Sequence, residues 1–274
     1  MKADLHVHSH YSDGSDSVEE LIKQAVKANV THMSIVDHDT VAEWPEVEEM
    51  GELNGVEVIP GVEISAYDYK RNRKVHVLGY LYRRDALHIK ELCMPLLQRR
   101  QKNSLWQIEQ IRSLGYPLDQ SEILETAKPS PTIYKQHIMR HITNKPYSSA
   151  DYRHLYRSLF KGDGVANRDI AYVDVFDAVE AIILDGGIAV VAHPGQLNSY
   201  ELIPELVEIG LGGIELTHPD HTKADHQQVI ELAKQYDLLM TGGTDYHGKF
   251  GIEIDVGDLT SPEIPFVHNG RVRG

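Results

Sequence analysis

Residues 4–14 read DLHVHSHYSDG, and this stretch decides the fold that we expect. Side chains two apart in an extended strand point to the same side. His6 and His8 are therefore expected to place their imidazoles together, where both can bind one metal ion. Asp13 follows a short polar turn, so its carboxylate can fold back toward the same point. The alternative is a buried strand with two incidental histidines, and this motif alone leaves the two interpretations about even.

The composition is that of a globular protein. The chain has 274 residues, 41% of them hydrophobic, which is ordinary for one large domain or two small ones. The only cysteine is Cys93, which excludes an internal disulfide and fits a reducing compartment. No apolar run approaches a membrane span or a signal peptide. We expect a soluble cytoplasmic protein without a membrane partner, while oligomeric state is left open.

Charge is distributed unevenly along the chain. The net charge of −14 argues against a general nucleic-acid coat. Residues 83–168 nevertheless contain 15 Lys and Arg against 8 Asp and Glu, whereas the remainder contains 12 against 33. A basic segment beside an acidic body suits a phosphorylated substrate. The alternative, a solvated helical surface, accounts for much of this charge.

Short apolar strands alternate with helical patterns over most of the chain. The expected strands are 3–8, 32–36, 56–62, 74–81, 188–192, 213–217 and 239–241. Such alternation predicts a parallel sheet, and this many repeats predict a closed or nearly closed barrel.

Metal-binding residue types recur where these strands end, which is where barrels of this kind carry their active sites. The residues at these ends are His38, Glu63, His193, Asp245 and His247. All are nitrogen or oxygen donors without a thiolate, which suits Mn, Fe or Zn. The pattern predicts one polynuclear metal centre.

Five motifs occur in order along the chain. They are HxHS…DG at 6–14, DHD at 37–39, GxE at 61–63, AHP at 192–194 and GxDxH at 243–247. This series resembles the PHP (polymerase and histidinol phosphatase) domain family, with the match spanning 1–82 and 187–250. The resemblance implies an α/β fold, a distorted seven-stranded (β/α) TIM-like barrel, with a trinuclear metal site.

The resemblance also implies which residues hold the three divalent ions. One ion would be bound by His6, His8, Glu63 and Asp245. A second would be bound by Asp13, His38 and His247, and a third by Glu63 as a bridge with His76 and His193. Asp13 stands where some members have histidine, which favours a harder ion such as Mn. His76 differs from the others because it lies within a strand.

Such a centre is suited to hydrolysing phosphate esters. A hydroxide that bridges two ions roughly 3.5–4 Å apart is a strong nucleophile near neutral pH. His193, Glu63 and Asp13 are the expected catalytic residues. Asp37 and Asp39 are expected to orient ligand imidazoles, whereas Asp4 either does the same or caps a turn.

A helical segment interrupts the barrel pattern. Helices are expected at 87–114, with Pro95 inside, and at 122–127, 133–142 and 150–160. We expect residues 1–82 and 173–274 to form the barrel and 83–172 to form a cap subdomain at its mouth. Relatives of similar length and insert placement are nucleotide phosphatases and exonucleases. They imply 5′-AMP, 3′,5′-bisphosphonucleosides or 5′-phosphorylated short single-stranded RNA as substrates.

Candidate substrate contacts follow from chemistry and position. They are Asn167, Arg168, Arg140, Lys135, Tyr134 and His218. An arginine in a helical insert is more often a surface charge than a ligand contact. His218 either meets the leaving group or caps a loop, and for His221 the loop role is favoured. Residues 129–132, PSPT, replace the Arg-Pro-His that relatives often carry.

Three other functions stay open. They are a phosphatase of small molecules like histidinol phosphate, a non-catalytic PHP module and an amidohydrolase-type barrel. The complete ligand series favours an enzyme over the non-catalytic module. The pair Asp245 and His247, together with the early Asp13, favours PHP over the amidohydrolase type.

Overall fold

One twisted sheet forms the centre of the molecule. The computed structural model describes residues 1–41, 44–268 and 271–273. The strand order is β1-β2-β3-β4-β6-β7-β8, with β5 beside β3. The strands are β1 (Ala3–Val7), β2 (His32–Ile35), β3 (Glu57–Asp68), β4 (Arg73–Tyr80), β5 (Val173–Asp174), β6 (Ile188–Val191), β7 (Gly213–Thr217) and β8 (Leu239–Gly242). A bridge between Val7 and Tyr246 brings the two sheet ends together, so the barrel is nearly closed, as predicted.

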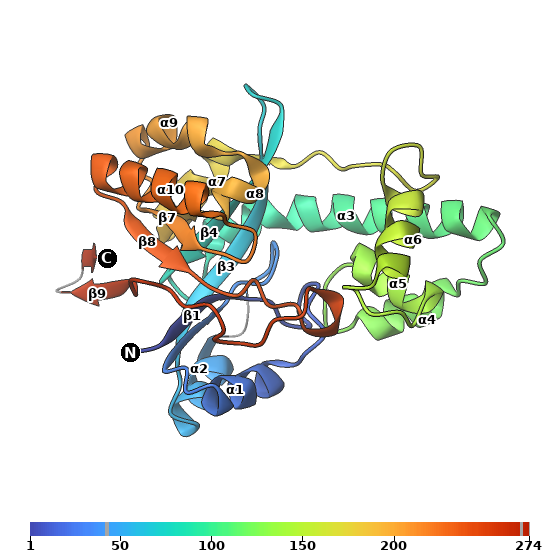
Figure 1. Cartoon of the computed structure of the whole chain (residues 1–274), viewed down its shortest axis with the longest axis horizontal. Helices are drawn as coiled ribbons and strands as arrows, with labels where there is room; N and C mark the ends of the chain where they lie inside the picture. Colours follow the sequence, from blue (N-terminus) through green and yellow to red (C-terminus); the bar gives the residue numbers. More distant parts are fainter. Residues whose placement is uncertain (42–43, 269–270, 274) are drawn as a thin grey trace.

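Helices cover the outside of this sheet. They are α1 (Val18–Lys27), α2 (Trp44–Leu53), α7 (Val175–Leu184), α8 (Pro194–Leu197), α9 (Ile203–Glu208) and α10 (Lys223–Tyr236). In Figure 1, α1 and α2 lie together on one side of the strands, and α7, α9 and α10 lie on the other. Ser17 caps α1, and Glu20 completes the capping box. Buried residues from α1, α2, α7, α9 and α10 pack with strand residues in one apolar cluster, and a second cluster consists mainly of strand residues such as Leu5, Leu78 and Val190.

The expectation of a wholly parallel sheet is wrong at one place. β3 and β4 form a long antiparallel hairpin, and β4 is also antiparallel to β6. Only four residues connect β3 to β4, too few for a crossover, so the chain reverses directly. As a result Glu63 lies in the middle of β3 rather than at its end. The hairpin also brings His76 opposite Ser65.

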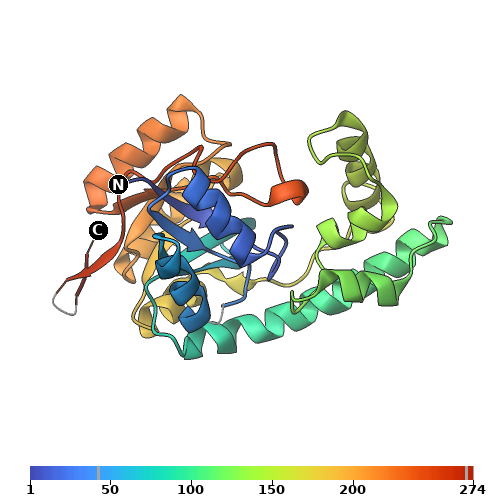
Figure 2. The same ribbon diagram turned by 90° about the horizontal axis from the view of Figure 1, so that it is seen from below.

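One long helix extends from the barrel into the insert. α3 (Leu87–Ser113) continues through Pro95 as a single helix. Its first half contributes Ile89, Cys93 and Leu96 to the barrel core, and its second half contributes Ile108 and Ile111 to a separate apolar cluster. The remaining helices of the insert are α4 (Gln120–Ala127), α5 (Lys135–Ile142) and α6 (Ala150–Phe160). Figure 2 shows them standing beside the barrel at the far end of α3.

The last part of the chain contains regular structure that the sequence did not indicate. A short helix, η2 (Gly248–Phe250), follows β8, and β9 (Phe266–His268) pairs antiparallel with β10 (Arg271–Arg273). Across the described residues, no helix combines the length and apolar character that crossing a membrane requires.

Candidate metal centre and active site

The turn after β1 is built to return Asp13 to the site. Asp37 accepts hydrogen bonds from the backbone N–H of Ser9 (2.8 Å) and from the hydroxyls of Ser9 (2.5 Å) and Ser12 (2.6 Å). Gly14 is required because a Cβ there would lie 2.4 Å from the carbonyl oxygen of His8. Asp37 therefore shapes the turn, whereas we expected it to orient an imidazole.

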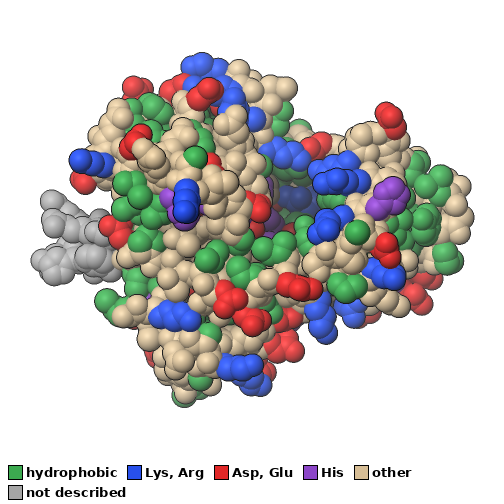
Figure 3. Space-filling model, viewed as in Figure 1, with side chains coloured by type: hydrophobic (Ala, Val, Ile, Leu, Met, Phe, Trp, Pro, Cys, Tyr) green, Lys and Arg blue, Asp and Glu red, His purple; other side chains and the backbone are tan. Residues whose placement is uncertain are grey.

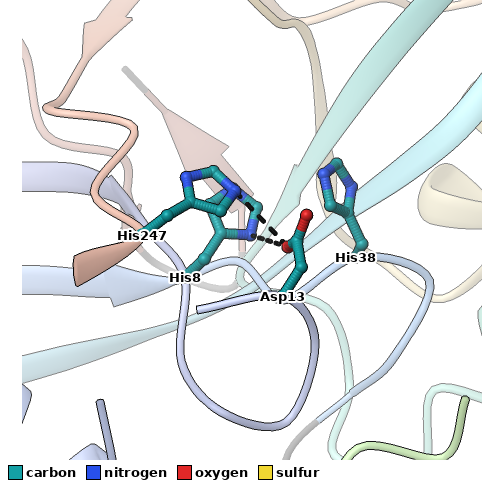
Figure 4. A group of neighbouring side chains, drawn as sticks. All are labelled: His8, Asp13, His38 and His247. Carbon is teal, nitrogen blue, oxygen red and sulfur yellow. Dashed lines mark ion pairs between the residues drawn. The ribbon is translucent and has the colours of Figure 1, made fainter. Parts of the chain in front are cut away.

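Four side chains converge next to this turn (Figure 4). They are His8, Asp13, His38 and His247, and each offers a donor atom within 4.8 Å of the others. Asp13 Oδ1 lies 3.4 Å from His247 Nε2 and 3.9 Å from His8 Nδ1. The predicted second ligand set is thus brought together, and His8 is added to it.

A second group surrounds Glu63 and Asp245. Its members are His6, His8, Glu63 and Asp245, the set expected for the first ion. His8 Nε2 lies 3.2 Å from both Glu63 Oε2 and Asp245 Oδ1. His6 Nε2 lies 3.4 Å from Glu63 Oε2 and 3.2 Å from Asp245 Oδ1. One carboxylate oxygen of each acid therefore faces both imidazoles.

The other oxygen of Glu63 faces two further imidazoles. His76 Nδ1 and His193 Nε2 each lie 2.9 Å from Glu63 Oε1. The third possible ion-binding group consists of His38, Glu63 and His76. His193 is not in that group, although it contacts the same oxygen. Glu63 thus lies at the centre of the cluster, with an oxygen on either side.

These residues fit divalent cations. Several buried ring nitrogens have no hydrogen-bond partner among the described residues, including His6 Nε2, both nitrogens of His8 and His38 Nδ1. Buried polar atoms without partners are costly, so a cluster of them indicates a bound group. Burial would raise the pKa of Glu63, but the surrounding imidazoles, His38 foremost, hold that pKa well below its usual range. Its carboxylate therefore stays ionised and can act as a metal ligand.

Glu215 is a functional residue that sequence reasoning missed. Its Oε1 lies 2.9 Å from His6 Nδ1, and its Oε2 accepts the backbone N–H of His193 at 2.7 Å. Glu215 is fully buried within β7. A carboxylate that fixes the outer nitrogen of a metal-binding histidine is a common supporting contact. The sequence did contain a signal: Glu215 lies between Ile214 and Leu216 in a predicted strand. A carboxylate in an apolar strand needs a partner if it is buried.

Asp39 and Asp4 also act on the backbone rather than on imidazoles. Asp39 accepts the backbone N–H of Ser65 (2.7 Å) and pairs with the guanidinium of Arg100 on α3 (2.7 Å). Asp4 accepts the backbone N–H groups of Thr244 (3.0 Å) and Gly257 (2.8 Å), joining β1 to the segment after β8. The expectation that Asp39 orients an imidazole is therefore wrong.

The insert contacts the ligand-bearing loops directly. Gln136 on α5 donates to Asp13 Oδ2 at 2.9 Å. The hydroxyl of Tyr134 donates to the carbonyl oxygen of His38 at 3.0 Å, and Arg100 lies over the Tyr134 ring at 4.8 Å.

A cleft with a cavity volume of about 460 Å³ opens beside the cluster, between barrel and insert (Figure 3). Four of the six predicted substrate contacts line it: Tyr134, Lys135, Arg168 and His218. The other two do not. Arg140 is exposed and lines a neighbouring cleft, and Asn167 is exposed and donates to the carbonyl of Gly162 at 2.6 Å.

The two loop histidines differ in role. His218 Nδ1 accepts the backbone N–H of Asp220 (3.1 Å), so Nε2 carries the proton and donates to Asp245 Oδ2 (3.2 Å). His221 accepts the backbone N–H of Gly195 and contacts the carbonyl of Leu216, which is the loop role favoured for it.

Comparison with known proteins agrees with this geometry. The PHP domain matches residues 4–182. A protein of Eggerthella lenta named phosphoribosyl 1,2-cyclic phosphate 1,2-diphosphodiesterase is 53% identical over 92% of this chain and 96% of its own. A Haemophilus influenzae protein named 5′-3′ exoribonuclease is 30% identical over 96% of this chain and 97% of its own.

A solved structure extends the agreement to three dimensions. It comes from Bifidobacterium adolescentis, and its description proposes a metal-dependent phosphoesterase. It superposes with a TM-score of 0.84 at 26% identity and covers 94% of this chain and 92% of its own. The motif order, the barrel and the relatives agree, so the chain belongs to the PHP domain family and is a metal-dependent phosphoesterase.

Proposed function

We propose that this enzyme opens a cyclic phosphodiester on a phosphorylated ribose, with phosphoribosyl 1,2-cyclic phosphate as its substrate. The name of the Eggerthella relative, at 53% identity over nearly the whole of both chains, supports this substrate. The sequence patterns had suggested nucleotides and RNA and did not suggest a cyclic ester. The observation that carries the chemistry is the convergence of unpartnered imidazole nitrogens on Glu63 at the side of a cleft.

The metal ligands in this proposal are the nine residues predicted from the motifs. They are His6, His8, Asp13, His38, Glu63, His76, His193, Asp245 and His247. We propose three ions, with Mn favoured over Fe and Zn because carboxylates contribute throughout. Divalent ions held in this way lower the pKa of bound water and neutralise charge on a phosphoryl group.

The protein's own groups hold this arrangement in place. Glu215 fixes the ring of His6, and His218 fixes Asp245 through its Nε2–H. We therefore propose His218 as a positioning residue rather than a proton donor to the leaving group. Glu63, Asp13 and His193 remain the proposed catalytic residues, since Glu63 is shared by two groups and His193 contacts it.

A second candidate is hydrolysis at the 5′ phosphate of nucleotides or of short single-stranded RNA. The Haemophilus relative, named 5′-3′ exoribonuclease, favours it at lower identity. The cytoplasmic location inferred from the single cysteine is likewise a proposal.

A substrate panel tests the proposal. Full-length protein loaded with Mn is incubated with phosphoribosyl 1,2-cyclic phosphate, AMP, 3′,5′-bisphosphoadenosine, histidinol phosphate and a 5′-phosphorylated oligoribonucleotide. Products are followed by phosphorus NMR. We expect the highest kcat/KM for the cyclic ester. A tenfold preference for another member of the panel, or no hydrolysis of the cyclic ester, would contradict it.

A further inference from the structure

Positively charged side chains from separate parts of the chain meet in the cleft. They are Lys74 on β4, Arg100 on α3, Lys135 on α5, Lys161 just after α6, and Arg168 in the segment that returns to the barrel. In Figure 3, Lys and Arg side chains gather around the hollow between barrel and insert. Elements distant in sequence thus supply positive charge to one cleft, whose lining also includes Asp169 and Asp220.

Three of these cations lack a carboxylate partner in the part of the chain that the structure describes. Lys74 pairs with Asp169 at 2.6 Å and Arg100 pairs with Asp39 at 2.7 Å. Among the described residues, no ion pair is formed by Lys135, Lys161 or Arg168. Uncompensated charges that converge in a cleft favour the binding of an anion.

Two of the three are nevertheless held in place. Arg168 lies 3.8 Å over the ring of Trp106, and its Nε donates to Asn103 Oδ1 at 2.6 Å. Lys135 lies 5.8 Å from the centre of the Phe160 ring. Stacking of this kind leaves the outer N–H groups of the guanidinium available for a planar or tetrahedral anion.

The neighbouring positive charges help to lower the pKa of Lys135. Burial is the main cause that lowers its pKa to about 8, Lys161 and Lys74 lower the pKa further, and Asp169 opposes this lowering. By contrast, the pKa values of Glu63 and Asp245 are lowered by imidazoles. The cleft therefore has a metal-binding region of imidazoles and carboxylates and a separate cationic region.

We propose that Lys135, Lys161 and Arg168 form a subsite for a second phosphate of the substrate, one that is not itself hydrolysed. This inference rests on the proposed function and deepens it. With phosphoribosyl 1,2-cyclic phosphate as substrate, the cyclic ester lies at the metal-binding region and the 5-phosphate lies among the three cations. The enzyme then selects substrates that carry two phosphate groups.

The first test compares two substrates that differ only in the second phosphate. The ratio of kcat/KM for phosphoribosyl 1,2-cyclic phosphate to that for ribose 1,2-cyclic phosphate is measured for full-length, Mn-loaded protein. The wild type is expected to prefer the former at least tenfold, and Lys161→Gln and Lys135→Gln are expected to lower this ratio at least fivefold. Lys102→Gln is the matched control, since Lys102 is exposed on α3 and does not line the cleft.

An unchanged ratio in both variants, or a wild type without preference, overturns the subsite. A second measurement distinguishes an absent phosphate subsite from a wrong proposed function, because it does not depend on hydrolysis. Ribose 5-phosphate is titrated into the same proteins by calorimetry, and the expected result is at least fivefold weaker binding to Lys161→Gln than to wild type or Lys102→Gln. Equal binding to all three overturns the subsite even if the enzyme hydrolyses a different ester.

Discussion

At the scale of single residues, the site depends on which carboxylates face imidazoles and which face the backbone. Glu63 and Asp245 face imidazoles, whereas Asp4 and Asp37 bind backbone or hydroxyl groups. Sequence position did not separate these roles, because Asp4 and Glu63 both lie within strands and yet face different partners. Glu215 falls in the first class although it belongs to none of the motifs.

Replacing Glu215 with glutamine tests its contribution. The amide keeps the shape of the side chain but loses the charge that makes the His6 ring a better ligand. We expect Mn affinity to fall roughly 10- to 100-fold, as for other second partners of metal-bound histidines. Calorimetric titration of Glu215→Gln with Mn measures this, with Glu208→Gln on the exposed surface of α9 as control. Equal Mn affinity in both variants would show that Glu215 does not contribute to metal binding.

The pKa of Lys135 predicts a pH dependence of phosphate binding. The ordinary pKa of lysine is lowered here to about 8, so the ammonium is mostly charged at pH 7 and mostly neutral at pH 9. A phosphomonoester is a dianion across that range. Losing the charge weakens one hydrogen bond by about 1 kcal/mol, or about fivefold in affinity.

We therefore expect the Kd of ribose 5-phosphate to rise about fivefold between pH 7 and pH 9. Calorimetry at several pH values measures it. In Lys135→Gln the rise should be absent. A rise of the same size in that variant would assign the pH dependence to another group.

At the scale of secondary-structure elements, the insert completes the metal-binding region. Gln136 on α5 donates to Asp13, Tyr134 just before α5 donates to the carbonyl of His38, and Arg100 on α3 pairs with Asp39. The chain segments that carry ligands are thus held from the cap side as well as from the barrel. These contacts predict that the cap influences metal retention and does more than bind substrate.

Removing the Gln136 amide should loosen the group formed with Asp13. In Gln136→Ala, Asp13 Oδ2 loses its donor and the carboxylate can rotate away from His247. We expect one class of Mn site to bind about tenfold more weakly, the size of a lost hydrogen bond to a charged group. Mn content after dialysis, measured by mass spectrometry, reports it. Gln228→Ala on the exposed part of α10 should keep the wild-type content, and the same content in Gln136→Ala would show that the barrel alone holds this group.

The elements also show where sequence reasoning succeeds. Strand–helix alternation and the ordered motifs were sufficient to predict the barrel, because each strand–helix repeat has its own local pattern of apolar residues. They did not predict the β3–β4 hairpin. The apolar run before Glu63 suggests that the strand ends there, whereas β3 continues to Asp68. Whether β3 stops or continues depends on pairing with β4, a long-range interaction. His76 reaches the cluster through the same hairpin, which explains why a proposed ligand lies within a strand.

At the scale of the whole molecule, the acidic barrel and the basic insert meet at one cleft. Counting charges along the sequence located the basic segment, but it did not indicate which cations face the cleft. Arg140 and Lys135 lie in one helix, yet the fold places only Lys135 among the cleft's lining. That distinction follows from the packing of α5 on Phe160 and the rest of the insert core, which no local pattern encodes.

The measurement that most directly tests the central claim is a Mn titration of metal-depleted, full-length protein, with calorimetry and hydrolysis of phosphoribosyl 1,2-cyclic phosphate followed on the same samples. We expect more than one bound Mn per chain, and hydrolysis that appears only as these sites fill. Hydrolysis that proceeds equally well with no bound metal, or a protein that binds no Mn, would contradict it.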